Sequence, residues 1–390
     1  MKKKVAILGS TGSIGKSLIN ILKKDKKNIE IILLTANNNI RELIKQEKTF
    51  KVKNIIVTNY IKFFYLKKIF NKKKINIYNN FDRMDKIFSK KKIDYVMNAV
   101  SGLDGLYPTL KIIKFTKKIA IANKESIICG WPLIKKLLLK NKTQFVPVDS
   151  EHYSIYSLIG NLKNNDIEKI YITASGGPFN SYPLSKFKSI KIKSALKHPN
   201  WKMGKKITID SATMMNKVFE IIEAKKIFDI SYKKLVILVH PKSYVHALVK
   251  FKNGLTKILI HDTNMTIPIF NSLYPNHQKK IKSKNLDLLI MNNLNFQKID
   301  KKKFPAVNIL KFLPDKHSLF ETVIVSANDK LVAMFLNDKI KFLDISKILL
   351  KIIKYKEFIK YKRIIPKNIA QIEQVSNYVS LKINSLRIYK

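Results

Sequence analysis

Two acidic clusters in this 390-residue chain have residue types and spacing suited to holding a divalent cation. Asp149 and Glu151 follow an apolar run and are two positions apart, so an extended backbone would point both carboxylates the same way. A later helix-patterned stretch puts Asn216, Glu220 and Glu223 on one face. Carboxylate oxygens suit Mg²⁺ or Mn²⁺, and such sites use few protein ligands. The alternative for the second cluster is a solvated helix face paired with lysines.

A glycine-rich turn near the start of the chain has the setting of a dinucleotide site. The sequence GSTGSIG, residues 9–15, follows the apolar run Val5–Leu8 and precedes a helix-patterned segment. Glycines permit the tight turn, and backbone N–H groups at the helix N-terminus bind pyrophosphate. Ser10, Thr11 and Ser13 add hydroxyl donors. We predict a nucleotide cofactor here, against the alternative of an ordinary strand-to-helix turn.

The second apolar run bears on which nucleotide binds. NAD-binding proteins usually place an acid about 20 residues after the glycines, where it holds the ribose 2′-hydroxyl. Here the run is followed by Asn37, Asn38 and Asn39, and the first carboxylate after the run is Glu42. A neutral, amide-rich loop with Arg41 nearby would not repel a 2′-phosphate, so the sequence favours NADP.

Polar groups follow several predicted strands. Residues 123–126 and 149–151, together with residues 9–15 and 37–39, all come directly after apolar runs. In a doubly wound sheet, ligands bind beyond the carboxyl ends of the strands, so we expect these four groups at one edge.

Two loops in the middle of the chain add candidate ligand contacts. Residues 175–178, Ser-Gly-Gly-Pro, could give backbone and hydroxyl donors to a phosphate, although a plain turn is the alternative. Residues 194–204 hold His198, Trp201 and Met203 in a loop, which favours a lid over a core plug.

The elements that must position these residues change in type along the chain. Up to about residue 150, apolar runs alternate with helix-patterned segments, which is typical of a parallel sheet covered on both faces. The predicted strands there are Val5–Leu8, Ile29–Thr35, Asn54–Thr58, Ile75–Tyr78, Asp94–Ala99, Ile119–Ala122 and Gln144–Val148. Later predicted strands are Lys169–Thr173, Ile207–Asp210, Leu235–Val239, and a hairpin of Tyr244–Phe251 and Leu255–Ile260. Residues 211–223 are predicted to form one helix, and helical patterns dominate from about Phe304.

We therefore predict an α/β chain with three parts. Residues 1–150 form an N-terminal Rossmann-like domain with a doubly wound parallel sheet. Residues 151–290 form a central α+β catalytic domain, and residues 291–390 form a linker and a small C-terminal helical domain.

The net charge of +49 raises the possibility of a nucleic acid or an anionic membrane as partner. The charge comes almost entirely from lysines spread along the chain, without arginine forks in one stripe, so we predict no specific nucleic-acid binding. No apolar run approaches the ~20 residues of a membrane helix, and the first run is too short for a signal peptide. One cysteine, Cys129, excludes an internal disulfide, so we predict a cytoplasmic protein.

The motifs together resemble the 1-deoxy-D-xylulose 5-phosphate reductoisomerase family of the non-mevalonate isoprenoid pathway. The matching stretches occur in the family's order and are GSTGSIG, ANKES, PVDSEH, TASGGPF, HPNWKMG, DSATMMNK, HPKSYVHALV and SANDKLVAMFL.

The resemblance implies a role for each matching residue. It implies NADPH binding by Thr11, Gly12, Ser13, Ile14, Asn39, Asn123, Lys124, Glu125 and Gly204. We assign Asn37 and Asn38 to the cofactor as well, although they stand where family members commonly have a glycine and a basic residue. It implies a divalent metal, Mg²⁺, Mn²⁺ or Co²⁺, held by Asp149, Glu151 and Glu220. It implies substrate binding by Ser150, Glu151, Ser175, His198, Trp201, Met203, Ser211, Asn216, Lys217 and Glu220, with catalysis by Lys124, Asp149, Glu151, His198, Lys217 and Glu220.

The implied chemistry is a retro-aldol and aldol isomerisation of a phosphorylated sugar, followed by reduction with NADPH. The resemblance also implies a homodimer built through the central domain. Two other hypotheses stay open: a metal-free NADP-dependent semialdehyde or hydroxy-acid dehydrogenase, and a basic nucleic-acid-binding protein whose enzyme site is a relic.

Overall fold

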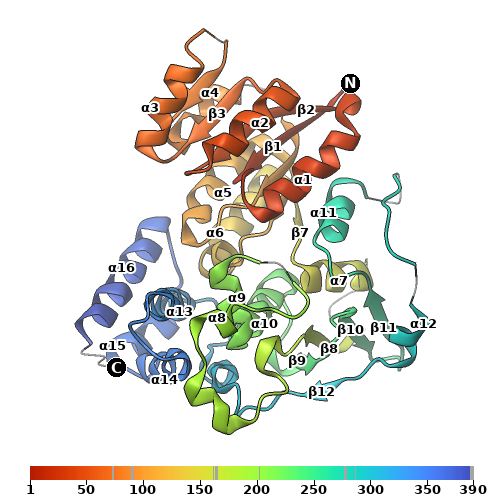
Figure 1. The fold of residues 1–390 in the computed structure, drawn as a ribbon, viewed down its shortest axis with the longest axis vertical. Coiled ribbons are helices and arrows are strands. Elements are labelled where there is room, and N and C mark those ends of the chain that lie inside the picture. The colour runs from red at the N-terminus through yellow and green to blue at the C-terminus, as the bar shows by residue number, and fades with distance from the viewer. Residues whose placement is uncertain are drawn as a thin grey trace. The chain divides into compact units, whose positions relative to one another are not determined.

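The chain forms two compact units in a computed structural model that describes residues 1–72, 74–88, 92–160, 162, 166–201, 203–275, 279–285 and 287–386. Unit 1 comprises Met1–Ile127, Leu133–Asp149 and Met265–Ile281. Unit 2 comprises Ile128–Pro132, Ser150–Asn264 and the chain from Lys282 onward. Figure 1 labels most of the helices and strands of both units.

Unit 1 is built on a parallel sheet of seven strands in the order β4-β3-β2-β1-β5-β6-β7. The order reverses beside β1, which pairs with both β2 and β5, so this point is the topological switch of the sheet. The strands are β1 (Lys3–Leu8), β2 (Ile29–Ala36), β3 (Asn54–Val57), β4 (Asn76–Tyr78), β5 (Ile93–Asn98), β6 (Thr116–Ile121) and β7 (Gln144–Pro147). All seven predicted strands of this region and the predicted α/β class are confirmed.

Apolar faces of the connecting helices bury the sheet of unit 1. These helices are α1 (Ser13–Lys24), α2 (Ile40–Phe50), α3 (Tyr60–Ile69), α4 (Met84–Ile87), α5 (Leu106–Ile112) and α6 (Lys124–Asn141). Leu18 and Leu22 of α1 pack into one core cluster with Leu43 of α2. The distant helix α11 (Thr266–Leu273) joins the same cluster through Ile269 and Leu273, which explains why residues 265–281 belong to unit 1.

Unit 2 contains a five-stranded sheet in the order β11-β10-β8-β9-β12. Its strands are β8 (Ile167–Ala174), β9 (Leu235–Val239), β10 (Val245–Phe251), β11 (Thr256–Ile260) and β12 (Gln297–Lys298). The predicted hairpin is confirmed, because β10 and β11 pair in antiparallel fashion. Two helices pack on this sheet: α7 (Ser150–Ile159) against β10 and β11, and α10 (Met215–Phe228) against β8 and β9.

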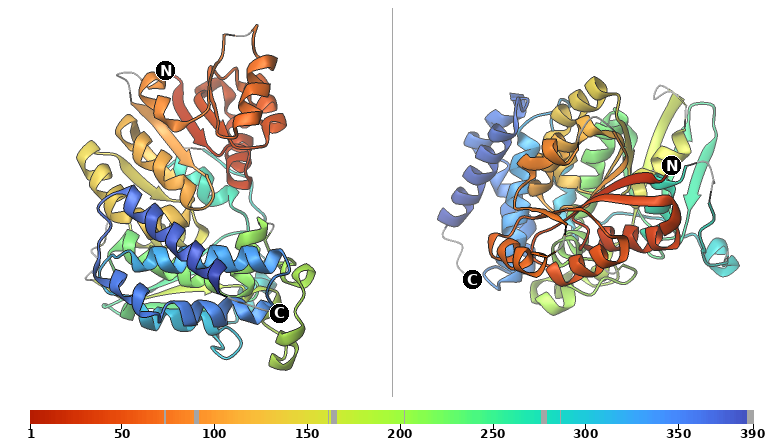
Figure 2. Two further views of the ribbon diagram at one scale, coloured as in Figure 1. Left: turned by 90° about the vertical axis from the view of Figure 1, so that its left-hand side faces the viewer. Right: turned by 90° about the horizontal axis from the view of Figure 1, so that it is seen from above.

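The chain after Phe304 is mainly helical, as predicted. Its helices are α13 (Phe320–Leu336), α14 (Phe342–Ile352), α15 (Lys356–Ile359) and α16 (Ile369–Ser385), and α13 packs against both α14 and α16 (Figure 2). Shorter helices of unit 2 are α8 (Ile192–Ala195), α9 (Lys205–Ala212) and α12 (Leu288–Asn292). No helix among the described residues is long and apolar enough to cross a membrane.

Three local expectations were wrong. Residues 207–210 form part of helix α9, not a strand, because burial against α10 and α13 overrides the β-branched sequence. The predicted single helix over residues 211–223 is broken at Met214, whose φ of 63° ends one helix and starts the next. Glu151 lies in the first turn of α7, where the helix dipole favours its charge, so the backbone after Asp149 is helical and not extended.

Candidate active site

The glycine-rich turn connects β1 to α1 at the switch point of the parallel sheet. Gly9 has φ 74°, and a Cβ there would lie 2.7 Å from the carbonyl oxygen of Ala99, so only glycine fits. The Gly9 N–H donates to Thr35 Oγ1 at 2.8 Å, which anchors the turn to β2. Gly12 is the N-cap of α1 and offers no side-chain cap. The N–H groups of the first helical turn are therefore available to an anion, which fits a cofactor pyrophosphate.

The loop after β2 keeps the amide character seen in the sequence. Asn37, Asn38 and Asn39 are exposed, and Asn39 caps α2 by accepting from the Glu42 N–H at 3.2 Å. The Glu42 carboxylate accepts from Gln46 Nε2 at 3.3 Å on its own helix. The nearest acid is thus tied to α2, so the loop presents amides where an NAD-binding protein usually presents a carboxylate.

Two further predicted groups follow β6 and β7 at the same edge of the unit 1 sheet. Lys124 is buried, and its Nζ lies 3.4 Å from Asp149 Oδ2. Asn123 caps α6 by accepting from the Ser126 N–H at 2.6 Å, while its amide donates to the Val100 carbonyl. The side chain of Asn123 therefore organises the loop after β5. Glu125 lies in the first turn of α6 and is buried.

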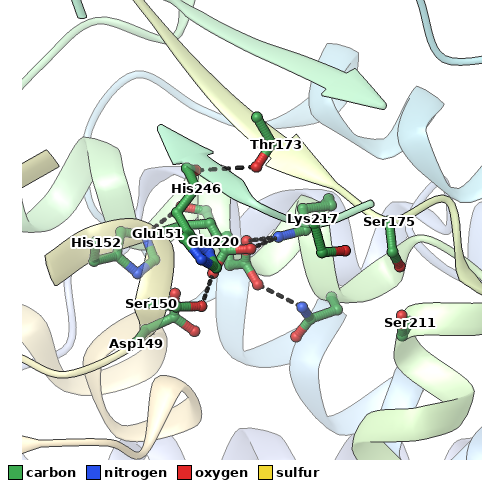
Figure 3. A network of polar contacts seen from close by, with 12 residues as sticks. Asp149, Ser150, Glu151, His152, Thr173, Ser175, Ser211, Lys217, Glu220 and His246 are labelled. Carbon is green, nitrogen blue, oxygen red and sulfur yellow. Dashed lines mark hydrogen bonds and ion pairs between the residues drawn. The ribbon is translucent and has the colours of Figure 1, made fainter. Parts of the chain in front are cut away.

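The carboxylates of unit 2 surround a lysine. Lys217 Nζ contacts the carboxylates of both Glu151 and Glu220, and the three side chains are nearly buried (Figure 3). Asn216 donates its amide to the other oxygen of Glu220, and Ser150 Oγ donates to Glu151. The lysine ammonium occupies the position of a cation between two hard oxygen donors. This donor set therefore fits a divalent metal ion.

Asp149 belongs to unit 1, but it directly precedes Ser150. Two peptide units separate the Cα atoms of Asp149 and Glu151, so chain connectivity alone keeps them within about 7 Å. A third carboxylate is thereby carried two positions before Glu151 in the chain.

His152 is a site residue that the sequence analysis did not single out. Its ring is fully buried, with Nε2 at 2.9 Å from the Glu220 carbonyl oxygen and Nδ1 at 3.7 Å from Glu223. Because a carbonyl only accepts, Nε2 carries the proton. His152 thus joins α7 to α10 beside the two acids. Its position next to Glu151 in the sequence was the available signal.

A second group in unit 2 brings Ser175, His198 and Ser211 together from three separate segments. His198 Nε2 lies 3.1 Å from the Oγ atoms of both serines. Nδ1 accepts from the backbone N–H groups of Asn200 and Trp201, so the proton sits on Nε2. Burial, reinforced by the charge of Lys217, lowers the pKa of His198 to about 4. The group therefore presents neutral N–H and O–H donors, which suit a phosphate.

The two glycines after Ser175 allow its turn to come close to helix α9. Gly177 has φ 65°, and a Cβ there would lie 3.0 Å from the Ser211 carbonyl oxygen. Gly176 has φ 84°, and a Cβ there would lie 2.6 Å from the Cβ of Asn180. The backbone of this turn can thus pass α9, which places Ser175 next to Ser211.

The predicted lid loop is anchored at Asn200. Its Nδ2 donates to the Pro241 carbonyl at 2.7 Å and to Ser243 Oγ at 2.8 Å. Trp201 packs edge-on against His246, with ring centroids 6.2 Å apart. Met203 is half-buried and Gly204 is the exposed N-cap of α9, whereas Lys202 lies outside the described residues. Closure of this loop stays a prediction.

Comparison with known proteins adds three family matches along the chain. Residues 5–130 match the model for 1-deoxy-D-xylulose 5-phosphate reductoisomerase, and residues 145–228 match the model for its C-terminal domain. Residues 261–380 match a further DXP reductoisomerase C-terminal domain. Together these segments cover most of the sequence.

Proteins of this name also match over nearly the full length. A 1-deoxy-D-xylulose 5-phosphate reductoisomerase of Pelagibacter ubique (strain HTCC1062) is 64% identical over 99% of this chain and 100% of its own. One of Clostridium tetani is 37% identical over 98% of this chain and 100% of its own.

Solved structures agree in fold. The Zymomonas mobilis enzyme in complex with NADPH is 30% identical with a TM-score of 0.88, covering 99% of each chain. A DOX-P reductoisomerase in complex with NADPH, fosmidomycin and magnesium is 29% identical with a TM-score of 0.90, covering 100% of each chain. The chain therefore belongs to the 1-deoxy-D-xylulose 5-phosphate reductoisomerase family.

Proposed function

We propose that this chain converts 1-deoxy-D-xylulose 5-phosphate and NADPH into 2-C-methyl-D-erythritol 4-phosphate and NADP⁺. The reaction has two parts: a retro-aldol and aldol rearrangement of the carbon skeleton, then reduction of the resulting aldehyde, which takes up one hydride and one proton. Family membership supports the activity, as do the relatives crystallised with NADPH and magnesium. The observation that carries it in this chain is the pair of buried carboxylates around Lys217.

The metal-binding residues in this proposal are Asp149, Glu151 and Glu220. A divalent cation held there would act as a Lewis acid toward the carbonyl and hydroxyl oxygens of the substrate. Lys217 contacts the carboxylates of both Glu151 and Glu220. With a cation held on these carboxylates, the Lys217 ammonium would donate to a substrate oxygen. Asn216 holds one oxygen of Glu220, so the carboxylate keeps its orientation.

The phosphate-binding residues in this proposal are Ser175, His198 and Ser211. Both serine hydroxyls lie within hydrogen-bonding distance of His198 Nε2, and the low pKa of His198 keeps it a neutral Nε2–H donor near pH 7. Binding the phosphate in this way fixes the orientation of the remaining carbon chain. Trp201 and Met203, on the adjacent loop, would then exclude water from the bound substrate.

The nucleotide-binding residues in this proposal are the turn of residues 9–15 and the loop of residues 37–39. NADPH supplies the hydride for the reduction step. The uncapped N-terminus of α1 binds the pyrophosphate. The loop of residues 37–39, which holds no acid, has room for the negative charge of the 2′-phosphate. Asn123, Lys124, Glu125 and Gly204 are proposed as further contacts of the cofactor.

We propose a homodimer that pairs through β11, because this edge strand leaves Ile258 exposed, as is Leu255 directly before it, and exposed apolar edges invite pairing. Light scattering of wild type and Ile258→Lys tests it, since the charged variant should be monomeric.

We also propose a cytoplasmic location, with which the single buried Cys129 is compatible, and cell fractionation tests it.

The test of the activity is NADPH oxidation with 1-deoxy-D-xylulose 5-phosphate, run with Mg²⁺ and with EDTA. Turnover that needs the metal, and that yields the branched tetrol phosphate, supports the proposal. The metal-free dehydrogenase is not favoured by the family comparisons; full turnover in EDTA would restore it.

A further inference from the structure

Two asparagine side chains are linked at the edge of the unit 1 sheet where the cofactor loop lies. Asn38 follows β2 and Asn59 follows β3, and these strands are neighbours in the parallel sheet. Asn59 Nδ2 donates to Asn38 Oδ1 at 2.8 Å. Asn59 Oδ1 accepts from the Lys62 N–H at 3.0 Å, and so caps helix α3.

The cap fixes which way both amides point. A backbone N–H can only donate, so the atom of Asn59 that faces Lys62 must be the oxygen. The opposite atom of Asn59 is then the NH₂ group, and it requires an acceptor on Asn38. Asn38 therefore turns its oxygen toward Asn59, which leaves its own NH₂ group on the far side as a donor. The orientation of Asn38 follows from the cap of α3, through one intervening side chain.

This orientation matters for the choice between the two nicotinamide cofactors. A 2′-phosphate is an anion that accepts hydrogen bonds, whereas the 2′-hydroxyl of NADH is normally held by a carboxylate acceptor. The nearest carboxylate, Glu42, is tied to Gln46 on α2. With the amide of Asn38 turned outward, the loop offers a donor at this position and no acidic acceptor.

We propose that Asn59 is a positioning residue that determines specificity for NADPH over NADH, acting through the amide orientation of Asn38. The inference rests on the proposed use of NADPH by this chain. Asn59 itself would not contact the cofactor. It holds the donor that does.

The variant Asn59→Ser tests this role. Serine keeps the N-cap of α3 but is too short to bridge to Asn38, so only the link is lost. We expect binding of 2′,5′-ADP, measured by calorimetry, to weaken about fivefold to tenfold, since a hydrogen bond to a charged group is lost in part. Binding of 5′-AMP should stay within about twofold, because it lacks the 2′-phosphate. In steady-state assays the KM for NADPH should rise by the same factor and the KM for NADH should not.

Two controls separate positioning from a general structural effect. Asn368 caps α16 through the same contact, accepting from the Gln371 N–H at 3.0 Å, so Asn368→Ser should leave both nucleotides unaffected. If Asn59 acts through Asn38, the double variant Asn38→Ala/Asn59→Ser should bind 2′,5′-ADP no more weakly than Asn38→Ala alone.

Three results would overturn the inference: an unchanged ratio of 2′,5′-ADP to 5′-AMP affinity in Asn59→Ser, an equal loss for both nucleotides, or additive losses in the double variant. Failure of the proposed function looks different. In that case the wild-type chain itself binds neither NADPH nor 2′,5′-ADP, and the inference falls with it.

Discussion

Removing the ammonium of Lys217 should make the stability of unit 2 depend on a divalent cation. Glu151 and Glu220 place carboxylate oxygens within 4.8 Å of one another. Two unit charges at that distance repel by about 3.5 kcal/mol at an effective dielectric constant of about 20. Lys217→Met keeps an apolar stem of similar size and removes the compensating charge. Without metal, the free energy of unfolding should therefore fall by about 3 kcal/mol, in the range for breaking a buried ion pair.

Tryptophan fluorescence during urea unfolding measures this change, because Trp131 and Trp201 both belong to unit 2. Saturating Mg²⁺ should return more than half of the lost stability to Lys217→Met, since a cation on the same carboxylates replaces the ammonium. Mg²⁺ should raise the free energy of unfolding of wild type by less, because in wild type the cation competes with the Lys217 ammonium for the same carboxylates.

The matched control is Lys226→Met on the same helix. Lys226 Nζ lies 2.8 Å from Glu321 Oε1, and both side chains are buried. This variant should lose a similar amount of stability, and Mg²⁺ should not restore it. If Mg²⁺ stabilised the two variants equally, or neither, the assignment of Glu151 and Glu220 to the cation would be refuted.

Two further predictions concern the phosphate-binding group. Gly177→Ala should raise the KM for the sugar phosphate about tenfold, because the added Cβ would meet the Ser211 carbonyl. The control is Gly160→Ala: Gly160 has a similar φ of 55° but open space around it, so this variant should leave the KM unchanged. His198 should titrate near pH 4 by NMR in place of the ordinary 6.5, because burial and Lys217 disfavour its charged form. The unfolded chain takes up this proton first, so His198 should make unit 2 less stable as the pH falls from about 6.5 toward 4 and should have no effect above 6.5. A titration midpoint near 6.5 would contradict the neutral donor proposed for the phosphate.

The parallel sheet and the polar groups at its edge could be predicted because the signals were local. Each strand of unit 1 is a short apolar run bounded by turn residues, and each polar group directly follows one strand. The helical periodicity that grouped Asn216 with Glu220 is also a property of neighbouring residues, and the two side chains do contact each other.

The wrong or missed predictions concern segments whose conformation or partners are decided by tertiary contacts. The segment Ile207–Asp210 has strand-like residues, but burial between helices makes it helical. The left-handed backbone at Met214 has no sequence signal, since methionine rarely adopts it. The links of His152 to the Glu220 carbonyl and of Asn59 to Asn38 join residues far apart in the chain, so spacing alone does not reveal them.

Whether turnover depends on a metal held by Glu220 is tested by comparing wild type with Glu220→Gln in two assays: NADPH oxidation with 1-deoxy-D-xylulose 5-phosphate, and NADPH binding by fluorescence. We predict turnover by wild type with Mg²⁺ and none in EDTA. Glu220→Gln should show no turnover while binding NADPH with nearly unchanged affinity, because Glu220 belongs to the carboxylate pair of unit 2 and the glycine-rich turn belongs to unit 1. Turnover by Glu220→Gln with Mg²⁺ or Mn²⁺, or full activity of wild type in EDTA, would contradict the account.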